Sequence, residues 1–302
     1  MSDFFNSGWS IGIAVATILG LVGCLALLIV AARRRVMAGD NTTGHIWDED
    51  LRELNNPLPR WWMWLFVLTI VISGVYLVLY PGLGSTAGTL NWSSVGQYKE
   101  EQAKAHALSA PLYAAFAAKP VMALARDPQA MAVGERLFAN TCAACHGADA
   151  HGSKGFPNLT DGDWLWGGSP ERIKETLTMG RQGMMPPMAA AIGTPQDVTN
   201  VANYVLMLSG GPDNLQAQLG RPKFAVCAAC HGADGKGNQA LGAPNLTDDV
   251  WLHGRGEAAI VAMVTKGKTN VMPAHADRLT PEQIHVLTAY VWGLSNPATA
   301  GK

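Results

Sequence analysis

Cys142-Ala143-Ala144-Cys145-His146-Gly147 occurs twice in this chain of 302 residues, the second time as Cys227-Ala228-Ala229-Cys230-His231-Gly232. Two thiols three positions apart can reach two points along one edge of a porphyrin, and the imidazole that follows can bind the iron. The spacing therefore predicts two covalently attached c-type haem groups. Their attachment residues are Cys142 and Cys145, with His146 as iron ligand, and Cys227 and Cys230, with His231 as iron ligand.

A pair of cysteines at this spacing also occurs in redox dithiols and in zinc sites, and in both of these the histidine would be incidental. A redox dithiol usually accompanies a βαβ pattern, which this sequence lacks, and two zinc-binding pairs usually lie about 15 to 20 residues apart. Cys145 and Cys227 are separated by far more than that. We therefore favour haem attachment over both alternatives.

Both motifs belong to a longer internal repeat, which also indicates a second iron ligand. Pro157-Asn158-Leu159-Thr160-Asp161 matches Pro244-Asn245-Leu246-Thr247-Asp248, and Met185-Pro186 matches Met272-Pro273 at the same offset. A thioether opposite an imidazole is a common ligand pair of electron-transfer haems, and it raises the reduction potential. We therefore predict Met185 and Met272 as the sixth ligands of two His/Met haem c groups.

Two further residues compete for these ligand positions. Met184 is an alternative for the first haem, and His275 is an alternative for the second. We assign each methionine to the haem of its own repeat. Paired units could instead exchange their methionine loops, in which case Met272 would face the first haem and Met185 the second. The sequence leaves that choice open.

The composition narrows the classes of function. The net charge is −1 and the isoelectric point is near 6.7, so nothing indicates a nucleic-acid partner. Of the five cysteines, four are the predicted haem thiols and the fifth, Cys24, lies in an apolar stretch, so no disulfide framework is indicated. A chain of this length is expected to form about two domains. Each repeat is small, and a buried haem would supply much of its apolar interior.

Two apolar stretches precede the haem motifs, and each is long enough to cross a bilayer as a helix. The first runs from Trp9 to Ala32, inside residues 4 to 32, which contain no charge; the second runs from Trp61 to Tyr80. A cleaved signal peptide carries its positive charge before the apolar stretch, whereas here Arg33 follows it. We therefore predict two retained membrane spans, with aromatic residues of the second span at both bilayer interfaces.

The charges beside the spans predict their orientation. The connecting loop carries five arginines, whereas residues 1 to 8 and 81 to 98 carry no lysine or arginine. Positive charge favours the cytoplasmic side, so the loop is predicted to be cytoplasmic and both termini periplasmic. Bacterial c-type haem is attached on the outer side of the inner membrane, which agrees with this orientation. The five residues are Arg33, Arg34, Arg35, Arg52 and Arg60.

Helices are predicted on both sides of each haem motif, and the fold class is predicted to be all-α. A glycine and an aromatic residue lie one helical turn apart before each motif, which lets two helices cross closely. Cap residues followed by proline begin later helices that carry further aromatic residues. These residues are Gly134 and Phe138, Gly220 and Phe224, Thr194 and Thr280, and Tyr204, Tyr290 and Trp292.

From residue 127 to residue 296 this pattern resembles two tandem class I cytochrome c domains. The resemblance implies that the carbonyls of Pro157 and Pro244 accept the ring N–H of the two ligand histidines. It also implies that Trp164 and Trp251 pack near a haem edge or propionate, although each could equally be a plain core aromatic. The predicted organisation is a first span (1–32), a cytoplasmic loop (33–60), a second span (61–80), a linker with helical segments (81–126), a first cytochrome domain (127–211) and a second one (212–302).

The membrane part resembles a narrower family. Thr43-Gly44-His45-Ile46-Trp47-Asp48 and the segment from Glu53 to Trp62 are similar to the N-terminal signature of the dihaem subunit of cbb3-type cytochrome c oxidases. The first span is an extra element compared with many members. The resemblance implies electron transfer from a soluble or membrane-bound donor cytochrome c, through two haems, to a monohaem cytochrome c subunit and a catalytic haem-copper subunit. Such a subunit has no catalytic site of its own.

Two other functions are compatible with the haem motifs. A free-standing membrane-anchored dihaem shuttle for another reductase would keep the same haem chemistry and differ only in its partner. A dihaem peroxidase would need one haem with an open or displaceable sixth position. The sequence does not give the two reduction potentials, the order of electron flow, the donor, or a role for Cys24 and the first span.

Overall fold

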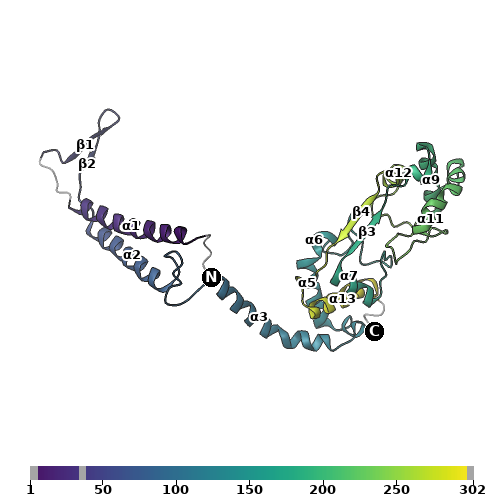
Figure 1. Ribbon diagram of the computed structural model, residues 1–302, viewed down its shortest axis with the longest axis horizontal. Coiled ribbons are helices and arrows are strands. Elements are labelled where there is room, and N and C mark those ends of the chain that lie inside the picture. The colour runs from purple at the N-terminus through teal and green to yellow at the C-terminus, as the bar shows by residue number, and fades with distance from the viewer. Residues whose placement is uncertain (1–5, 34–38, 298–302) are drawn as a thin grey trace. The chain divides into compact units, whose positions relative to one another are not determined.

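The computed structural model describes residues 6–33 and 39–297 (Figure 1). Arg34 and Arg35, which contributed to the predicted orientation, lie outside these ranges. The chain divides between Leu108 and Ser109 into two compact units, and each is described by itself.

The N-terminal unit contains two long apolar helices, α1 (Ser7–Ala32) and α2 (Arg60–Leu79). Both are long and apolar enough to cross a membrane, and neither contains a buried residue. The side chain of Asn6 caps α1 by accepting a hydrogen bond from the backbone N–H of Trp9 at 3.1 Å. The hydroxyls of Ser10 and Ser85 lie 2.8 Å apart and join the start of α1 to the segment after α2. The apolar side chains of α1 and α2 are therefore not buried by the rest of the described chain.

The segment between these helices contains an antiparallel hairpin of β1 (Thr42–Trp47) and β2 (Leu51–Leu54). Asp48 adopts a positive φ of 50° in the turn, a conformation that aspartate tolerates better than most residues. The prediction of an all-α chain is therefore wrong in part, because this hairpin and a second two-stranded sheet, of β3 (Arg181–Met185) and β4 (Lys268–Met272), interrupt a mostly helical structure.

The C-terminal unit is built from short helices around two haem motifs. α3 (Ser94–Ala117) leads into it. Helices α9 (Pro195–Leu208) and α13 (Pro281–Ser295) each begin with a capping box, formed by Thr194 with Asp197 and by Thr280 with Gln283. The helices before the first sheet strand are α4 (Val121–Leu124), α5 (Pro128–Thr141), α6 (Ala143–His146) and α7 (Pro170–Met179). The remaining elements are β3 (Arg181–Met185), α8 (Ala189–Ile192), α9 (Pro195–Leu208), α10 (Leu215–Gly220), the 3₁₀ helix η1 (Arg221–Phe224), α11 (Ala225–His231), α12 (Glu257–Lys266), β4 (Lys268–Met272) and α13 (Pro281–Ser295).

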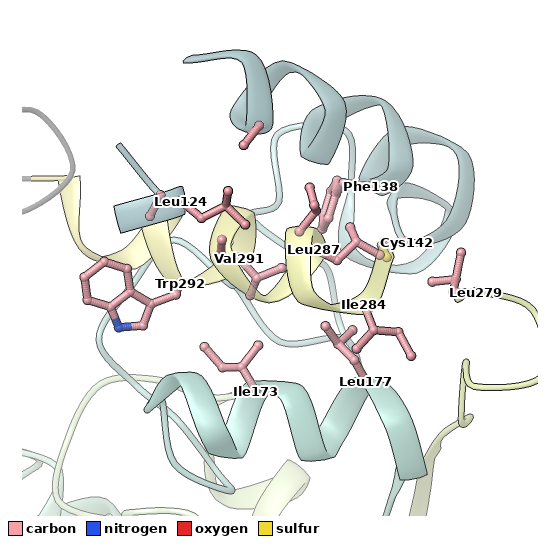
Figure 2. Packing of buried hydrophobic residues seen from close by; sticks show 14 of the residues in the cluster. Leu124, Phe138, Cys142, Ile173, Leu177, Leu279, Ile284, Leu287, Val291 and Trp292 are labelled. Atoms are coloured by element: carbon pink, nitrogen blue, oxygen red, sulfur yellow. The ribbon is translucent and has the colours of Figure 1, made fainter. Parts of the chain in front are cut away.

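The helix before the first haem motif crosses the last helix of the chain. In α5, a Cβ atom on Gly134 would lie 2.7 Å from Cβ of Tyr290 in α13, so only glycine permits this approach. The rings of Phe138 and Tyr290 lie 5.5 Å apart. Figure 2 shows side chains of α13, among them Ile284 and Leu287, facing α5 on one side and α7 on the other. We call this first cluster of buried residues, which includes Cys142, cluster 1.

The second cluster, cluster 2, has the same plan with different partners. Helix α9 packs against α10, η1 and α12, and the ring of Tyr204 lies 5.2 Å from that of Phe224. A Cβ atom on Gly220 would lie 2.1 Å from the carbonyl oxygen of Asn200, so these helices also cross at a glycine. Each predicted glycine–aromatic pair thus packs against a helix that carries a tyrosine, α13 with Tyr290 in cluster 1 and α9 with Tyr204 in cluster 2.

The two clusters divide the chain in an unexpected way. Cluster 1 contains residues up to Leu177 and then residues from Met272 onward, whereas cluster 2 contains only residues between Met185 and Val264. The two cores therefore do not follow one another along the chain at residue 211. At the β3–β4 ladder the first repeat passes from cluster 1 into cluster 2, and the second repeat passes from cluster 2 into cluster 1. We call this exchange the crossover.

Candidate haem-binding sites

The first ligand histidine is held at the end of a short helix. His146 ends α6, is 7% exposed, and its Nδ1 lies 3.0 Å from the carbonyl oxygen of Pro157. Because a carbonyl only accepts hydrogen bonds, this contact requires a proton on Nδ1 and leaves the lone pair on Nε2. The chain can therefore present Nε2 of His146 to a metal while Pro157 fixes the orientation of the ring.

The second histidine repeats this arrangement. His231 ends α11, is 8% exposed, and its Nδ1 lies 3.0 Å from the carbonyl oxygen of Pro244. A glycine follows each histidine with nearly the same backbone conformation, φ 79° at Gly147 and φ 78° at Gly232. The two motifs thus form matched sites. In each one, the hydrogen-bond acceptor of the histidine Nδ1 is the carbonyl of the proline that the resemblance indicated.

Burial raises the pKa of the first thiol of each pair, Cys142 and Cys227. Burial, with a smaller contribution from neighbouring Cys145, raises the pKa of Cys142 to about 11. Burial, followed by Cys230, likewise raises the pKa of Cys227. Such thiols stay protonated and are poor thiolate ligands or redox nucleophiles. Within the described ranges, no group of three or more His, Cys, Asp or Glu side chains is placed to hold a metal ion.

The candidate methionine ligands lie on opposite sides of the crossover. Met272 packs against cluster 1, the one that contains Cys142, whereas Met185, like Cys227, packs against cluster 2. The structure therefore places Met272 with the cluster of the first haem motif and Met185 with the cluster of the second. This placement is the one expected if the methionine loops are exchanged, which is the alternative to our assignment of each methionine to its own repeat.

The rival ligands are placed differently. Met184 is 70% exposed, because strand alternation turns it away from the face that carries Met185. His275, considered for the second haem, lies on the side of the first: it is 8% exposed, and burial, Arg278 and His146 lower its pKa. The repeat does not indicate this placement, because the residue that corresponds to His275 in the first repeat is Met188.

Unpartnered buried polar atoms test whether a haem fits these sites. Within the described part of the chain, Nε1 of Trp251 and Nδ1 of His275 are buried without a hydrogen-bond partner, as are Oδ1 of Asn41 and a guanidinium nitrogen of Arg181 that lies 2.9 Å from Glu175. Buried polar groups in native proteins are rarely left unpaired, so such atoms indicate a missing partner. Trp251 packs against cluster 2 and Trp164 against cluster 1, which are the positions expected beside a haem. The donors present thus fit a group with polar substituents on an apolar ring.

Known families match this chain over most of its length. A model described as the N-terminal domain of cytochrome oxidase-cbb3, FixP, matches residues 39–87, and one described as cytochrome c oxidase, cbb3-type, subunit III matches residues 129–205 and 223–291. The cbb3-type cytochrome c oxidase subunit CcoP of Rubrivivax gelatinosus is 66% identical over 300 residues, which is 99% of both chains.

The chain belongs to the CcoP/FixP family, subunit III of cbb3-type cytochrome c oxidases. The FixP subunit of Azorhizobium caulinodans is 44% identical over 84% of this chain and 92% of its own. That of Bradyrhizobium sp. (strain ORS 278) is 42% identical over 85% of this chain and 96% of its own. This CcoP/FixP chain is therefore an electron-transfer subunit of a cbb3-type oxidase, and its cytochrome c domains imply covalently bound haem c.

Proposed function

We propose that this subunit carries two haem c groups with exchanged methionine ligands. His146 and Met272 would hold the haem attached at Cys142 and Cys145, and His231 and Met185 the haem attached at Cys227 and Cys230. The observation that carries the proposal is the placement of each methionine against the buried cluster that includes the haem motif of the other repeat.

The residues of this chain would give each haem the properties of an electron carrier. A bound haem supplies the one-electron exchange between ferric and ferrous iron. Pro157 and Pro244 hold the proton on Nδ1 of the two histidines, so each imidazole stays neutral and fixed in orientation. The thioethers favour ferrous iron and so raise the potential. Because the protein would supply both a histidine and a methionine to each iron, neither site would be left open to oxygen.

We further propose that α1 and α2 cross the bacterial inner membrane. The loop at 33–60 would lie in the cytoplasm and both haem sites in the periplasm. Electrons would arrive from a soluble or membrane-bound donor cytochrome c and leave through a monohaem cytochrome c subunit to the catalytic haem-copper subunit. The apolar, unburied surfaces of α1 and α2 support this placement, since lipid or neighbouring helices would cover them.

A ligand series on the full-length, haem-loaded chain tests the haem chemistry. Met185→Ala and Met272→Ala should each remove about half of the sulfur-to-ferric charge-transfer band and lower the potential of one haem. Met184→Ala is the matched control, and it should leave the band unchanged because Met184 is exposed. A high-spin ferric signal in the unaltered chain, with hydrogen peroxide turnover, would support the peroxidase instead.

Purification tests the partners. The subunit is tagged in its native host, extracted in mild detergent, and assayed for oxygen uptake with reduced cytochrome c. We expect it to carry a monohaem cytochrome and a haem-copper subunit, with uptake that cyanide inhibits. Isolation of the chain alone, or with a different reductase, would favour the membrane-anchored shuttle.

A further inference from the structure

The two strands that carry the candidate methionine ligands pair directly with each other. In the antiparallel β3–β4 ladder, Met272 is opposite Arg181 and Met185 is opposite Lys268, with Gly183 and Asn270 at the centre. Each methionine is therefore held through its backbone by a strand of the other repeat. The ladder lies between the two clusters and is the only strand pairing within the described residues 109–297.

A glycine at the start of β3 lies against the turn that follows Met272. A Cβ atom on Gly180 would be 2.5 Å from the Met272 carbonyl oxygen and 2.7 Å from the backbone nitrogen of Ala274. Gly180 also has a φ of 72°, which disfavours a side chain regardless of space. Because the atoms it meets are backbone atoms, any side chain here would displace the Met272 turn itself.

The second repeat mirrors this contact. A Cβ atom on Gly267, at the start of β4, would be 2.6 Å from the Met185 carbonyl oxygen and 2.9 Å from the nitrogen of Pro187, and its φ is 67°. Cβ atoms essentially never approach other atoms closer than 3.0 Å. Each glycine thus fits the methionine turn of the opposite repeat as closely as backbone atoms allow.

A hydrogen bond fixes the far side of each turn. The backbone N–H of His275, three residues after Met272, donates to the carbonyl of Leu177 at 3.0 Å. The N–H of Met188, three residues after Met185, donates to the carbonyl of Val264 at 2.8 Å. Leu177 lies in α7, just before Gly180, and Val264 lies in α12, just before Gly267. Each methionine turn therefore contacts the other repeat at two points, the glycine and this hydrogen bond.

We propose that Gly180 is a positioning residue for Met272 and Gly267 a positioning residue for Met185. Each glycine sets the distance of a thioether from the iron of the haem that its own repeat carries. The inference rests on the proposed His/Met ligation and adds the residues that maintain it. Displacing the Met185 carbonyl from 2.6 Å to at least 3.0 Å moves the ligand backbone by tenths of an ångström, and the Fe–S bond is sensitive to such a shift.

The test uses full-length, haem-loaded protein in which only one methionine can contribute the sulfur-to-ferric band. With Met272→Ala present, the remaining band reports Met185, and we expect Gly267→Ala to weaken it strongly and to lower the potential of that haem. Gly180→Ala should leave it nearly unchanged. With Met185→Ala present, the two glycine changes should exchange their effects.

Gly256→Ala is the matched control, since Gly256 has a φ of 120° at the start of α12 but nothing within 4 Å of its Cβ position. Gly256→Ala introduces backbone strain without contacting a methionine turn. In the Met272→Ala background it should therefore leave the sulfur-to-ferric band of Met185 unchanged. An unchanged band in Gly267→Ala, or equal losses in Gly267→Ala and Gly256→Ala, would overturn the proposal.

Two further outcomes are kept distinct. Absence of the band from the unaltered chain would refute His/Met ligation itself, and with it the proposed function. If Gly267→Ala fails to retain two haems, Pro187→Ala serves instead: it removes the Cδ atom that meets Gly267, which should loosen the Met185 turn. Added imidazole should then displace that ligand more readily, and an unchanged imidazole affinity would contradict the proposal.

Discussion

The crossing of α5 with α13 can be measured as an interaction energy between two aromatic rings. Phe138 is 1% exposed, and its ring lies 5.5 Å from that of Tyr290 at an interplanar angle of 47°. We expect Phe138→Leu and Tyr290→Leu each to lower the free energy of unfolding by about 1–3 kcal/mol. The double variant should lose less than the sum, because the second change removes a contact that the first has already broken.

The size of this coupling follows from the geometry. Aromatic pairs at such distances contribute about 0.5–1.5 kcal/mol beyond the area they bury, which is the expected coupling energy. The control pairs Phe138→Leu with Tyr204→Leu. Tyr204 is the residue that Phe138 would meet if the first cytochrome domain were made of consecutive residues, but its ring contacts Phe224 instead. For that pair we expect a coupling within about 0.5 kcal/mol of zero.

The assay is urea unfolding of the full-length, haem-loaded chain in detergent, followed by the haem absorbance. The free energies of unfolding are compared with one shared denaturant slope m for all variants. This reduces the extrapolation error, which would otherwise exceed a small coupling energy. A coupling energy for Phe138 with Tyr204 that equals or exceeds the one with Tyr290 would refute the crossed arrangement.

Three further predictions concern cluster 1 and its surroundings. Gly134→Ala should lower stability by about 1–3 kcal/mol through overpacking against Tyr290, despite the helix propensity of alanine, and an unchanged urea midpoint would contradict the close crossing. Thr280→Ala should cost about 1 kcal/mol by removing the cap of α13, while Thr280→Ser should cost less in the same assay. Hydrogen bonds from Arg181 and a second arginine lower the pKa of Glu175 from 4.5 to about 2, so its carboxylate stabilises the fold fully above pH 4.5 and loses that effect as the pH falls through 2. Glu175→Gln should therefore flatten the stability profile between these values, and parallel profiles for the two proteins would show that the ion pairs contribute nothing.

Much of the local structure could be predicted from the sequence because its causes are local. The caps at Thr194 and Thr280 and the glycine–aromatic pairs depend only on neighbouring residues, and all of them are present. The strands β3 and β4 were missed, since Arg181–Met185 has no β-rich alternation and forms a strand only where tertiary contacts bring the partner.

The pairing of the helices could not be derived from the repeat. Both copies carry nearly the same features, so α5 could equally have met the aromatic helix of either copy. One signal was nevertheless available. Helix α9 ends at Leu208 and α10 begins at Leu215, and elements joined by so short a connection usually pack side by side. That contact commits α9 to cluster 2, which leaves α13 for cluster 1.

The crossover reverses the order in which the two cores can be completed during synthesis. Cluster 2 draws only on residues between Met185 and Val264, so all its parts emerge together. Cluster 1 begins earlier in the chain, yet it must wait for α13, the last helix among the described residues. Domains usually fold as they emerge, the N-terminal one first. Here the surroundings of His146, the first of the two ligand histidines to be made, are the last to be completed. A chain stopped before Pro281 would lack the α13 part of cluster 1 while retaining every residue of cluster 2.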